Sequence, residues 1–364
     1  MERPALVSLY SGCGGSARGF EDAEFEVKYL NDNDPDAAES LEKNFPNAVV
    51  EKGNIKKKEE IVKLWEQVGE ADVIEGGFPC QGFSLAGPRQ IDDARNNLYH
   101  YLKKAIAYGN PKFFVAENVK GFVTIGENGK FKMYQDGKLR LGRVASAIVS
   151  DLENAGMGYE VKYDILNAMD YGLPQDRKRI IIVGVRKNLD FEFKFPKKTH
   201  GPGLQKYVTM EKHGVMDIHL DDSEVYMEAK GKRKDYFSSR YMSRNRIRQW
   251  NQVSFTIPAE AAQVPADPES GKKMWNLPDK VIKNVKDSEW AEFRKVHDKD
   301  ISKSLKRLSW RRCASIQGFP PDYKFRGDIK SKYKQIGNAV PPLLMKKVAE
   351  CIIPYFEGEK KSYK

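Results

Sequence analysis

The sequence predicts an α/β fold, in which a mostly parallel, Rossmann-like sheet is joined to a smaller domain of another kind. Three observations support this prediction. Short apolar runs alternate with helical stretches over about the first 190 residues, a glycine-rich turn follows the first run, and the alternation stops after Lys187. Strands that alternate with helices form parallel sheets through right-handed crossovers, so this part of the chain is expected to hold one sheet.

The elements follow from the hydrophobic patterning. The predicted strands are Ala5–Tyr10, Phe25–Leu30, Ala48–Glu51, a run that begins at Asp72, Lys112–Ala116, Tyr159–Leu166 and Arg179–Val185. The predicted helices are a short stretch after Ser16, Pro35–Phe45, Lys56–Val68, Asn97–Tyr108, Val144–Asn154 and, near the C-terminus, Leu343–Ile353. The apolar residues of the last helix are expected to pack back on the first domain.

Polar or reactive residues directly follow several of these strands. Gly12, Asp32, Asn54, Cys80 and Glu117 each come just after a predicted strand. Ligands of open α/β sheets bind at the carboxyl ends of the strands. These residues are therefore expected to lie on one edge of the sheet and to form a site.

Length, charge and cysteine content exclude several classes of protein. The longest apolar run in the 364 residues, Ile180–Val185, is far too short to cross a membrane. Four cysteines without C-x-x-C spacing argue against a disulfide framework and a structural zinc site, and they favour a cytoplasmic protein without a metal. The net charge of +11 and the pI of about 9.2 favour a polyanionic partner.

The turn Ser11–Ser16 contains three glycines between a strand and a helix. Such a turn brings backbone N–H groups close to a ligand, and Asp32, at the end of the next strand, can accept hydrogen bonds from ribose hydroxyls. Together they predict a nucleoside cofactor, which could be NAD, FAD or S-adenosylmethionine. The alternative is an ordinary tight turn with a helix-capping aspartate.

Cys80 follows a short buried strand, two glycines and Pro79. A thiol on a rigid turn just past a strand is placed as a nucleophile would be. The alternative is a small buried apolar residue, which is what most free cysteines are.

Basic and aromatic residues are frequent after Lys187. Residues 230–248 hold eight lysines and arginines and one acid, Asp235. This run is either a solvated face or a surface for phosphates and base edges. We expect residues 1–190 to form a catalytic and cofactor-binding domain, 191–306 a target-recognition domain, and 307–364 a hinge and a segment that packs back on the first domain.

Six short motifs are spread in order over nearly the whole chain. They are Tyr10-Ser11-Gly12-Cys13-Gly14-Gly15, Gly77-Phe78-Pro79-Cys80-Gln81, Glu117-Asn118-Val119, Gln175-Asp176-Arg177-Lys178-Arg179, residues 311–320 and residues 335–341. In sequence and order they resemble the motifs of the cytosine-C5 DNA methyltransferases of the bacterial and phage restriction-modification type.

This resemblance implies a covalent mechanism. C5 of cytosine is too poor a nucleophile to attack a methyl sulfonium unaided, so a thiol first adds at C6, a role that falls to Cys80. Glu117, neutral when buried beside the base, would donate a hydrogen bond to N3, and Arg179 would contact O2. Arg177 completes the catalytic set by bracing the site or binding a phosphate. No side chain stands out as the base that removes the C5 proton.

The resemblance also implies S-adenosylmethionine as the cofactor. The residues carried over to its site are Tyr10, Ser11, Gly12, Cys13, Gly14, Gly15, Asp32, Asn33, Asn54, Ile55, Phe78, Pro79, Leu98, Asn338 and Ala339. Two of them depart from the family pattern. Asn54 stands where an aspartate is usual, and its amide oxygen can still accept a hydrogen bond. Asn33 replaces a larger residue that would stack on the adenine.

The resemblance to the cytosine-C5 DNA methyltransferases also implies which residues recognise the target DNA. Residues 81–96 resemble the mobile loop that closes over a flipped base, and the segment after Tyr241 resembles the recognition domain of the GGCC-methylating branch. The residues expected to contact DNA are Gln81, Ser84, Arg95, Arg244, Arg246 and Arg248. Ala262 occupies a position where that branch has a further arginine.

The expected partners are double-stranded DNA and, without direct contact, a cognate restriction endonuclease that acts on the same site. The protein is expected to be a cytoplasmic monomer. Three alternatives remain from the residues: a tRNA methyltransferase of the same chemistry, an NAD-dependent oxidoreductase, and a catalytically silent DNA-binding protein. The basic recognition segment favours duplex DNA over RNA, since A-form RNA hides its major-groove edges.

Overall fold

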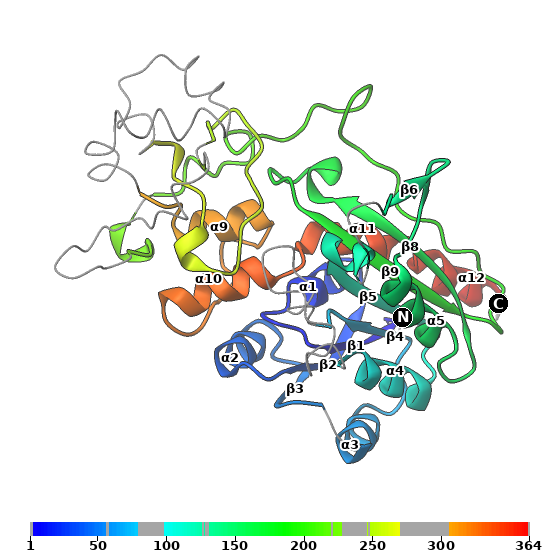
Figure 1. The fold of residues 1–364 in the computed structure, drawn as a ribbon. Coiled ribbons are helices and arrows are strands. Elements are labelled where there is room, and N and C mark those ends of the chain that lie inside the picture. Colours follow the sequence, from blue (N-terminus) through cyan, green and yellow to red (C-terminus); the bar gives the residue numbers. More distant parts are fainter. Residues whose placement is uncertain are drawn as a thin grey trace. The chain divides into compact units, whose positions relative to one another are not determined.

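The computed structural model of the chain describes residues 3–55, 58–78, 98–125, 127, 131–219, 221–227, 246, 248–269 and 306–362. The chain forms two compact units (Figure 1). The first consists of Met1–Asn167, Lys178–Lys197 and Val340–Lys364, and the second of Ala168–Arg177 and Lys198–Ala339. The functional roles predicted for residues 1–190, 191–306 and 307–364 stay predictions.

A seven-stranded sheet forms the centre of the first unit, with the order β3-β2-β1-β4-β5-β9-β8. Its strands are β1 Ala5–Leu9, β2 Glu26–Asp32, β3 Val49–Lys52, β4 Val73–Gly76, β5 Phe113–Val119, β8 Tyr159–Asn167 and β9 Lys178–Arg186. The first five strands are parallel, whereas β9 runs antiparallel to β5 and to β8. The predicted Rossmann-like α/β class is confirmed. No crossover helix separates β8 from β9, so this pair can run antiparallel.

Helices cover both faces of this sheet (Figure 1). They are α1 Gly15–Glu21, α2 Pro35–Asn44, α3 Lys58–Val68, α4 Leu98–Gly109, α5 Arg143–Glu153, α11 Pro342–Glu350 and α12 Ile353–Ser362. A short hairpin of β6 Tyr134–Gln135 and β7 Lys138–Leu139 precedes α5. The side chains alternate between the faces of each strand, so Phe114 joins the core under α3, α4 and α5, while the ring of Phe113 packs 5.2 Å from Tyr355 of α12.

Local sequence signals set the ends of several helices. Asp34 caps α2 by accepting hydrogen bonds from the N–H groups of Asp36 and Ala37, and Pro35 occupies the first turn, where no N–H partner is needed. Helix α9, Trp310–Gln317, begins at the cap Ser309 and ends at Gly318, whose φ of 87° lies in the left-handed region. Asp328 caps α10, Ile329–Asn338.

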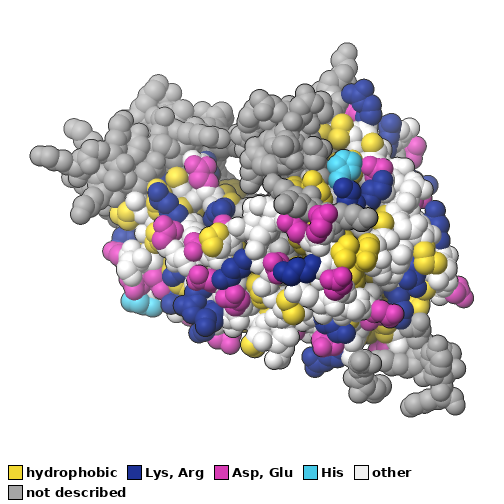
Figure 2. Space-filling model, turned by 90° about the horizontal axis from the view of Figure 1, so that it is seen from below, with side chains coloured by type: hydrophobic (Ala, Val, Ile, Leu, Met, Phe, Trp, Pro, Cys, Tyr) yellow, Lys and Arg dark blue, Asp and Glu magenta, His cyan; other side chains and the backbone are white. Residues whose placement is uncertain are grey.

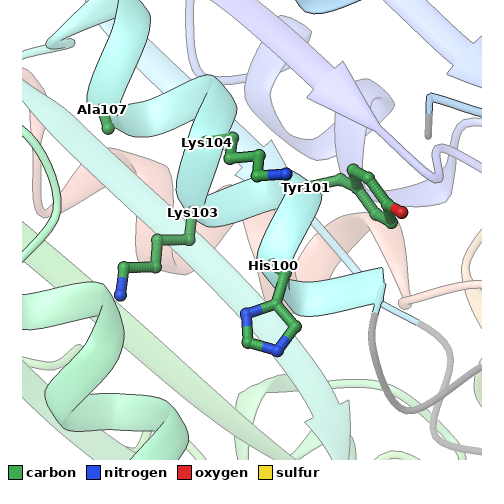
Figure 3. Close-up of a pocket in the computed structure, with 5 residues that line it drawn as sticks. All are labelled: His100, Tyr101, Lys103, Lys104 and Ala107. Atoms are coloured by element: carbon green, nitrogen blue, oxygen red, sulfur yellow. The ribbon is translucent and has the colours of Figure 1, made fainter. Parts of the chain in front are cut away.

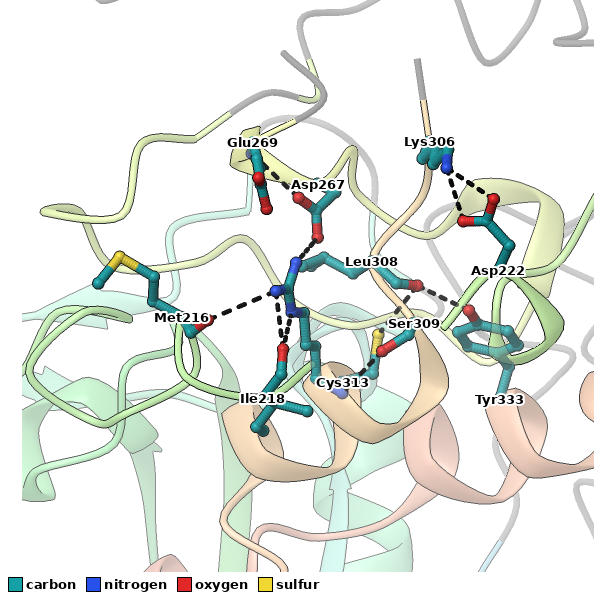
Figure 4. Close-up of polar contacts among 11 residues, drawn as sticks. Met216, Ile218, Asp222, Asp267, Glu269, Lys306, Leu308, Ser309, Cys313 and Tyr333 are labelled. Atoms are coloured by element: carbon teal, nitrogen blue, oxygen red, sulfur yellow. Dashed lines mark hydrogen bonds and ion pairs between the residues drawn. The ribbon is translucent and has the colours of Figure 1, made fainter. Parts of the chain in front are cut away.

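The described part of the second unit contains α9, α10 and short 3-10 turns, including η4 Ala168–Tyr171, η5 Asp222–Glu224 and η7 Ala261–Gln263. A buried ion pair lies among them (Figure 4). Arg312 Nη1 lies 2.5 Å from Asp267 Oδ2, and the guanidinium also donates to the carbonyl of Ile218. Because both charges are buried, removing either one would leave the other uncompensated. Burial raises the pKa of Asp267, and Arg312 opposes that rise.

No helix among the described residues is both long and apolar enough to cross a membrane. Lys and Arg side chains are interspersed with Asp and Glu over the described residues of the face in Figure 2. The excess of positive charge is therefore not gathered on that part of the surface. The basic run at residues 230–245, which the sequence favours for DNA contacts, lies outside the described residues.

Helix α1 packs on α11 through Gly19. A Cβ atom at this position would lie 2.4 Å from the carbonyl oxygen of Pro342 and 2.8 Å from Cβ of Met345. Real Cβ atoms do not approach backbone this closely, so α1 and α11 would have to move apart to admit a side chain.

We expect Gly19→Ala to lower the thermal unfolding midpoint by several degrees, since overpacking costs about 1–3 kcal/mol. Gly358→Ala in α12 is the matched control, because a Cβ there meets nothing within 4 Å. This control should hold or raise the midpoint, since alanine favours a helix by about 1 kcal/mol over glycine. Calorimetry on both variants checks the contact, and equal midpoints would contradict it.

Candidate active site

The carboxyl ends of β2, β1, β4 and β5 meet at one edge of the sheet. Their pairing is in register: Leu9 of β1 lies beside both Asn31 and Gly76, and Gly76 lies beside Ala116. The residues that follow in each strand or turn are therefore aligned across four strands, a width of about 14 Å at the usual strand spacing. Among the described residues, Gly12, Asp32 and Glu117, which the sequence placed after strands, lie at this edge.

A tight turn leaves β1 at the edge. Tyr10 has φ 55°, Gly12 has φ 56° and Gly14 has φ 88°, so the turn uses the left-handed region at three positions, one of them not glycine. The N–H of Gly12 donates to Oδ2 of Asp32 over 2.7 Å. A Cβ on Gly12 would meet nothing within 4 Å, so there is open space beside the turn. Cys13 is buried within the turn, and burial raises the pKa of its thiol well above the usual range.

The other residues predicted to bind a cofactor differ in exposure. Asn33 and Asn54 are exposed, whereas Ile55 and Phe78 are buried. The hydroxyl of Tyr10 donates to the carbonyl of Leu98 over 3.0 Å, which ties the turn to the start of α4. Asn338 and Ala339 belong to the second unit, where the Ala339 carbonyl accepts hydrogen bonds from Arg177 and Gln317.

Sequence reasoning missed Asn31. Its buried side-chain amide donates to the carbonyls of Glu51 and Gly53, each over 3.0 Å, and so holds the end of β2 to the segment that leads to Asn54. An asparagine at the end of an apolar run was the available signal, but the pairing of β2 with β3 is needed to interpret it.

Glu117 and Arg179 form an ion pair at the end of β5. Nε of Arg179 lies 2.8 Å from Oε1 of Glu117, and each side chain is only 11% exposed. The antiparallel pairing places Glu117 beside Ile181, so Arg179, two residues away, projects from the same face. Burial lowers the pKa of Arg179, and the charge of Glu117 opposes this effect. The pair holds both groups at the edge of the sheet.

Asn118 links β5 to the segment that leads toward Cys80. Its buried amide donates to the carbonyl of Phe78 over 3.1 Å. The ring of Phe78 packs 5.8 Å from that of Phe122. These contacts position the chain up to Phe78, two residues before the predicted nucleophile. The predicted site residues that lie outside the described residues are Pro79, Cys80, Gln81, Ser84, Arg95 and Arg244.

Arg177 lies fully buried in the second unit. Its guanidinium donates to the carbonyls of Ile257 over 3.0 Å, Gly337 over 2.6 Å and Ala339 over 2.9 Å. The last two bonds join the end of the segment between η4 and β9 to the end of α10. They favour the bracing role predicted for Arg177 over contact with a phosphate.

Two arginines predicted to contact DNA, Arg246 and Arg248, contact other residues of the second unit. Arg246 Nη2 donates to Oε1 of Gln263 over 2.7 Å, and the Arg248 guanidinium lies 3.9 Å from the ring centre of Phe255. Burial lowers the pKa of Arg248. Because of the bond to Gln263, reading of a base by Arg246 Nη2 would require its release from that side chain. At Ala262, where the GGCC-methylating branch has a further arginine, the backbone carbonyl accepts two hydrogen bonds from Arg307, at 3.1 and 3.2 Å.

A groove of about 550 Å³ lies elsewhere, along α4 (Figure 3). The described residues that line it are His100, Tyr101, Lys103, Lys104 and Ala107. Lys103 is paired with Asp151 over 2.8 Å, and the Lys104 ammonium lies 5.2 Å from the Tyr101 ring centre. None of the predicted catalytic or cofactor residues that the structure describes lines this groove, so the strand edge is the better candidate for the active site.

The chain is similar to known proteins in sequence and in fold. The family model described as C-5 cytosine-specific DNA methylase matches residues 5–354. The Type II methyltransferase M.BspRI of Lysinibacillus sphaericus is 36% identical over 96% of this chain and 81% of its own, and M.MthTI of Methanothermobacter thermautotrophicus is 34% identical over 97% and 98%. The solved structure of the Dnmt2 methyltransferase of S. pombe has the same fold, with a TM-score of 0.63 at 16% identity over 98% and 99% of the two chains.

The bracing role of Arg177 is open to test. Arg177→Met should lower the unfolding midpoint by several degrees, since it removes the donor to the buried carbonyls of Ile257 and Gly337, at about 1–3 kcal/mol for each group left unsatisfied, whereas the Ala339 carbonyl keeps Gln317. Arg186→Met on β9, where the side chain is half-buried, is the control and should cost less. If Arg177→Met unfolds like the wild type yet loses activity, a catalytic role would replace the bracing one.

Proposed function

The chain belongs to the C-5 cytosine-specific DNA methylase family, and from this premise we propose that it methylates cytosine through a covalent adduct between Cys80 and C6. The enzyme is a DNA (cytosine-5-)-methyltransferase. The observation that carries the mechanism is the Glu117–Arg179 pair, held at the edge where β4 leads toward Cys80. The NAD-dependent oxidoreductase alternative is wrong, because the family match covers nearly the whole chain.

S-adenosylmethionine, when bound, supplies the methyl group. The residues that would hold it in the first unit are those of the Gly12–Gly15 turn, Asp32, Phe78 and Leu98. The fit is supported by the open space beside Gly12 and by the Asp32 carboxylate at the end of the neighbouring strand. Asp32 Oδ2 already accepts from the turn, which would orient the carboxylate toward a ribose.

Cys80 forms the new bond in this mechanism. Its thiolate adds to C6 of a cytosine that has left the duplex, and electron density moves to C5. After methylation the proton on C5 leaves, and the electrons of that bond re-form the C5–C6 double bond as the thiolate is expelled. Asn118 would position the nucleophile indirectly, since it holds the carbonyl of Phe78.

Glu117 and Arg179 would stabilise the negative charge that develops on the ring. Arg179 would shift from Glu117 onto O2 of the base, and Glu117, protonated once this partner is shared, would donate to N3. A donor already aligned at the site lowers the barrier without further reorganisation. The ion pair would therefore keep both groups in position before the base arrives.

The proposed substrate is duplex DNA with a short G/C-rich site, GGCC or a close relative. Arg244 and Arg246 would each fork onto a guanine, which is worth about 1–3 kcal/mol of discrimination per base. Release of Arg246 from Gln263 would couple reading to a change in the recognition segment. We further propose that the protein acts in the cytoplasm as a monomer, within a restriction-modification system whose endonuclease reads the same site.

The first test supplies purified protein with labelled S-adenosylmethionine and either duplex DNA or tRNA. The proposal expects label in DNA as 5-methylcytosine. Cys80→Ser should retain cofactor and DNA binding but lose turnover, since a serine hydroxyl is a far poorer nucleophile. Label in tRNA alone would show that the substrate is tRNA and not DNA. A Cys80→Ser variant with wild-type turnover would show that Cys80 is not the nucleophile.

Bisulfite sequencing of DNA from cells that express the protein would show the methylated site. Arg244→Ala and Arg246→Ala are expected to broaden the methylated set, because each removes a contact to one base. Lys206→Ala, in the second unit outside the predicted reading segment, is the control and should leave the consensus unchanged. An AT-rich consensus, or unaltered consensus in both arginine variants, would reject this assignment.

A further inference from the structure

Glu75 is a buried acid that the proposed mechanism does not use. It lies in β4, within the apolar run Val73-Ile74-Glu75, and its side chain is almost fully enclosed, with 2% of the residue exposed. In the sheet it is the direct partner of Ser8 on β1. A carboxyl group in such a position needs hydrogen bonds, because burial without them is costly.

A chain of hydroxyl groups leads from Glu75 to the turn after β1. The Ser8 hydroxyl lies 2.6 Å from Oε2 of Glu75 and 2.9 Å from the hydroxyl of Ser11. The Ser11 hydroxyl in turn lies 2.9 Å from the carbonyl oxygen of Ser8 and 3.2 Å from the N–H of Asn31. The Asn31 N–H supplies its own proton. The other three contacts, Glu75 to Ser8, Ser8 to Ser11 and Ser11 to the Ser8 carbonyl, each need a proton from a hydroxyl or carboxyl group.

The number of protons distinguishes two states of these hydrogen-bonded groups, with Glu75 ionised or neutral. Two hydroxyl groups carry two protons, which cannot serve three contacts when Glu75 is ionised. A neutral carboxyl group adds the third: it donates to Ser8, Ser8 donates to Ser11, and Ser11 donates to the Ser8 carbonyl. The geometry is therefore complete only when Glu75 carries a proton.

The surroundings of Glu75 favour this neutral state. Burial raises its pKa to about 7, and the Ser8 and Ser16 hydroxyls, from β1 and α1, oppose the rise. Glu117, on the same face of β5, raises it further, although Arg179 is paired with that carboxylate. Glu75 consequently changes charge near neutral pH instead of near the ordinary value of a carboxyl group.

The turn needs support, because Tyr10 holds a strained left-handed conformation directly before Ser11. We propose that Glu75 is a positioning residue for the cofactor turn: it donates a hydrogen bond to Ser8, Ser8 can then donate to Ser11, and the turn is held in its binding shape. This role rests on the proposed use of S-adenosylmethionine. Loss of the proton would leave the contact between Ser8 and Ser11 without a donor and loosen the turn.

A pH dependence of cofactor affinity follows. The raised pKa means that the neutral form prevails below about pH 7, so the turn is fully supported there and loses its support as the pH rises through that value. The dissociation constant for S-adenosylmethionine should therefore rise several-fold between about pH 6 and pH 8.5. The α-amino group of the cofactor also titrates in this range, so a control protein is required.

The experiment compares three variants by calorimetric binding of S-adenosylmethionine across this pH range. Glu75→Gln keeps a donor at every pH and should bind like the wild type at low pH, with only the pH dependence that belongs to the cofactor. Glu75→Leu removes the donor and should raise the dissociation constant about tenfold at all pH values. Val73→Ala, on the same face of β4, loses packing alone and should keep the wild-type pH profile.

Methylation kinetics provide a second readout. Glu75→Leu should raise KM for the cofactor while kcat at saturation stays near wild type, because Glu75 touches no reacting atom. Identical pH profiles for wild type and Glu75→Gln would overturn the proposal, and this comparison decides the matter even if Glu75→Leu fails to fold. A wild type that binds no S-adenosylmethionine would overturn both the positioning role and the proposed function, whereas binding with identical profiles overturns only the former.

Discussion

The parallel alignment of β2, β1, β4 and β5 is the constraint on which the candidate site depends. Backbone hydrogen bonds between neighbouring strands fix their register, and the register brings the four carboxyl ends to one edge. Asp32, the Gly12 turn, the approach to Cys80 and Glu117 all begin at that edge. Residues from distant parts of the sequence thus become neighbours through the pairing of the strands that carry them.

Buried polar side chains secure the loops that leave this edge. Asn31 ties the end of β2 to the segment after β3, Asn118 ties β5 to the segment after β4, and Asp32 accepts from the turn after β1. Each bond satisfies a group whose isolation would cost about 1–3 kcal/mol. These contacts hold the segments that carry the site, in addition to the strand pairing that forms the sheet.

The strands and helices of the first unit could be predicted because apolar runs and helical periodicity are local signals. Asp32 and Glu117 could be placed at the edge because each comes at or just past the end of a predicted strand. The contacts of Glu75, Ser8 and Asn31 could not, since they depend on which strands are neighbours and in which register. The close pair of Glu117 and Arg179 likewise depends on β9 running antiparallel beside β5, which the alternation of elements does not specify. The described contacts of Arg246 and Arg248 were also beyond sequence reasoning, because their partners Gln263 and Phe255 come from later in the chain.

Covalent trapping tests the central claim most directly. Duplex DNA with 5-fluorocytosine at the methylated position is mixed with the protein and S-adenosylmethionine, and the digested product is sequenced by mass spectrometry. Fluorine cannot leave C5 as a proton does, so the adduct should persist on the peptide that contains Cys80. An adduct on a different residue, or no adduct with protein that methylates ordinary DNA, would contradict the account.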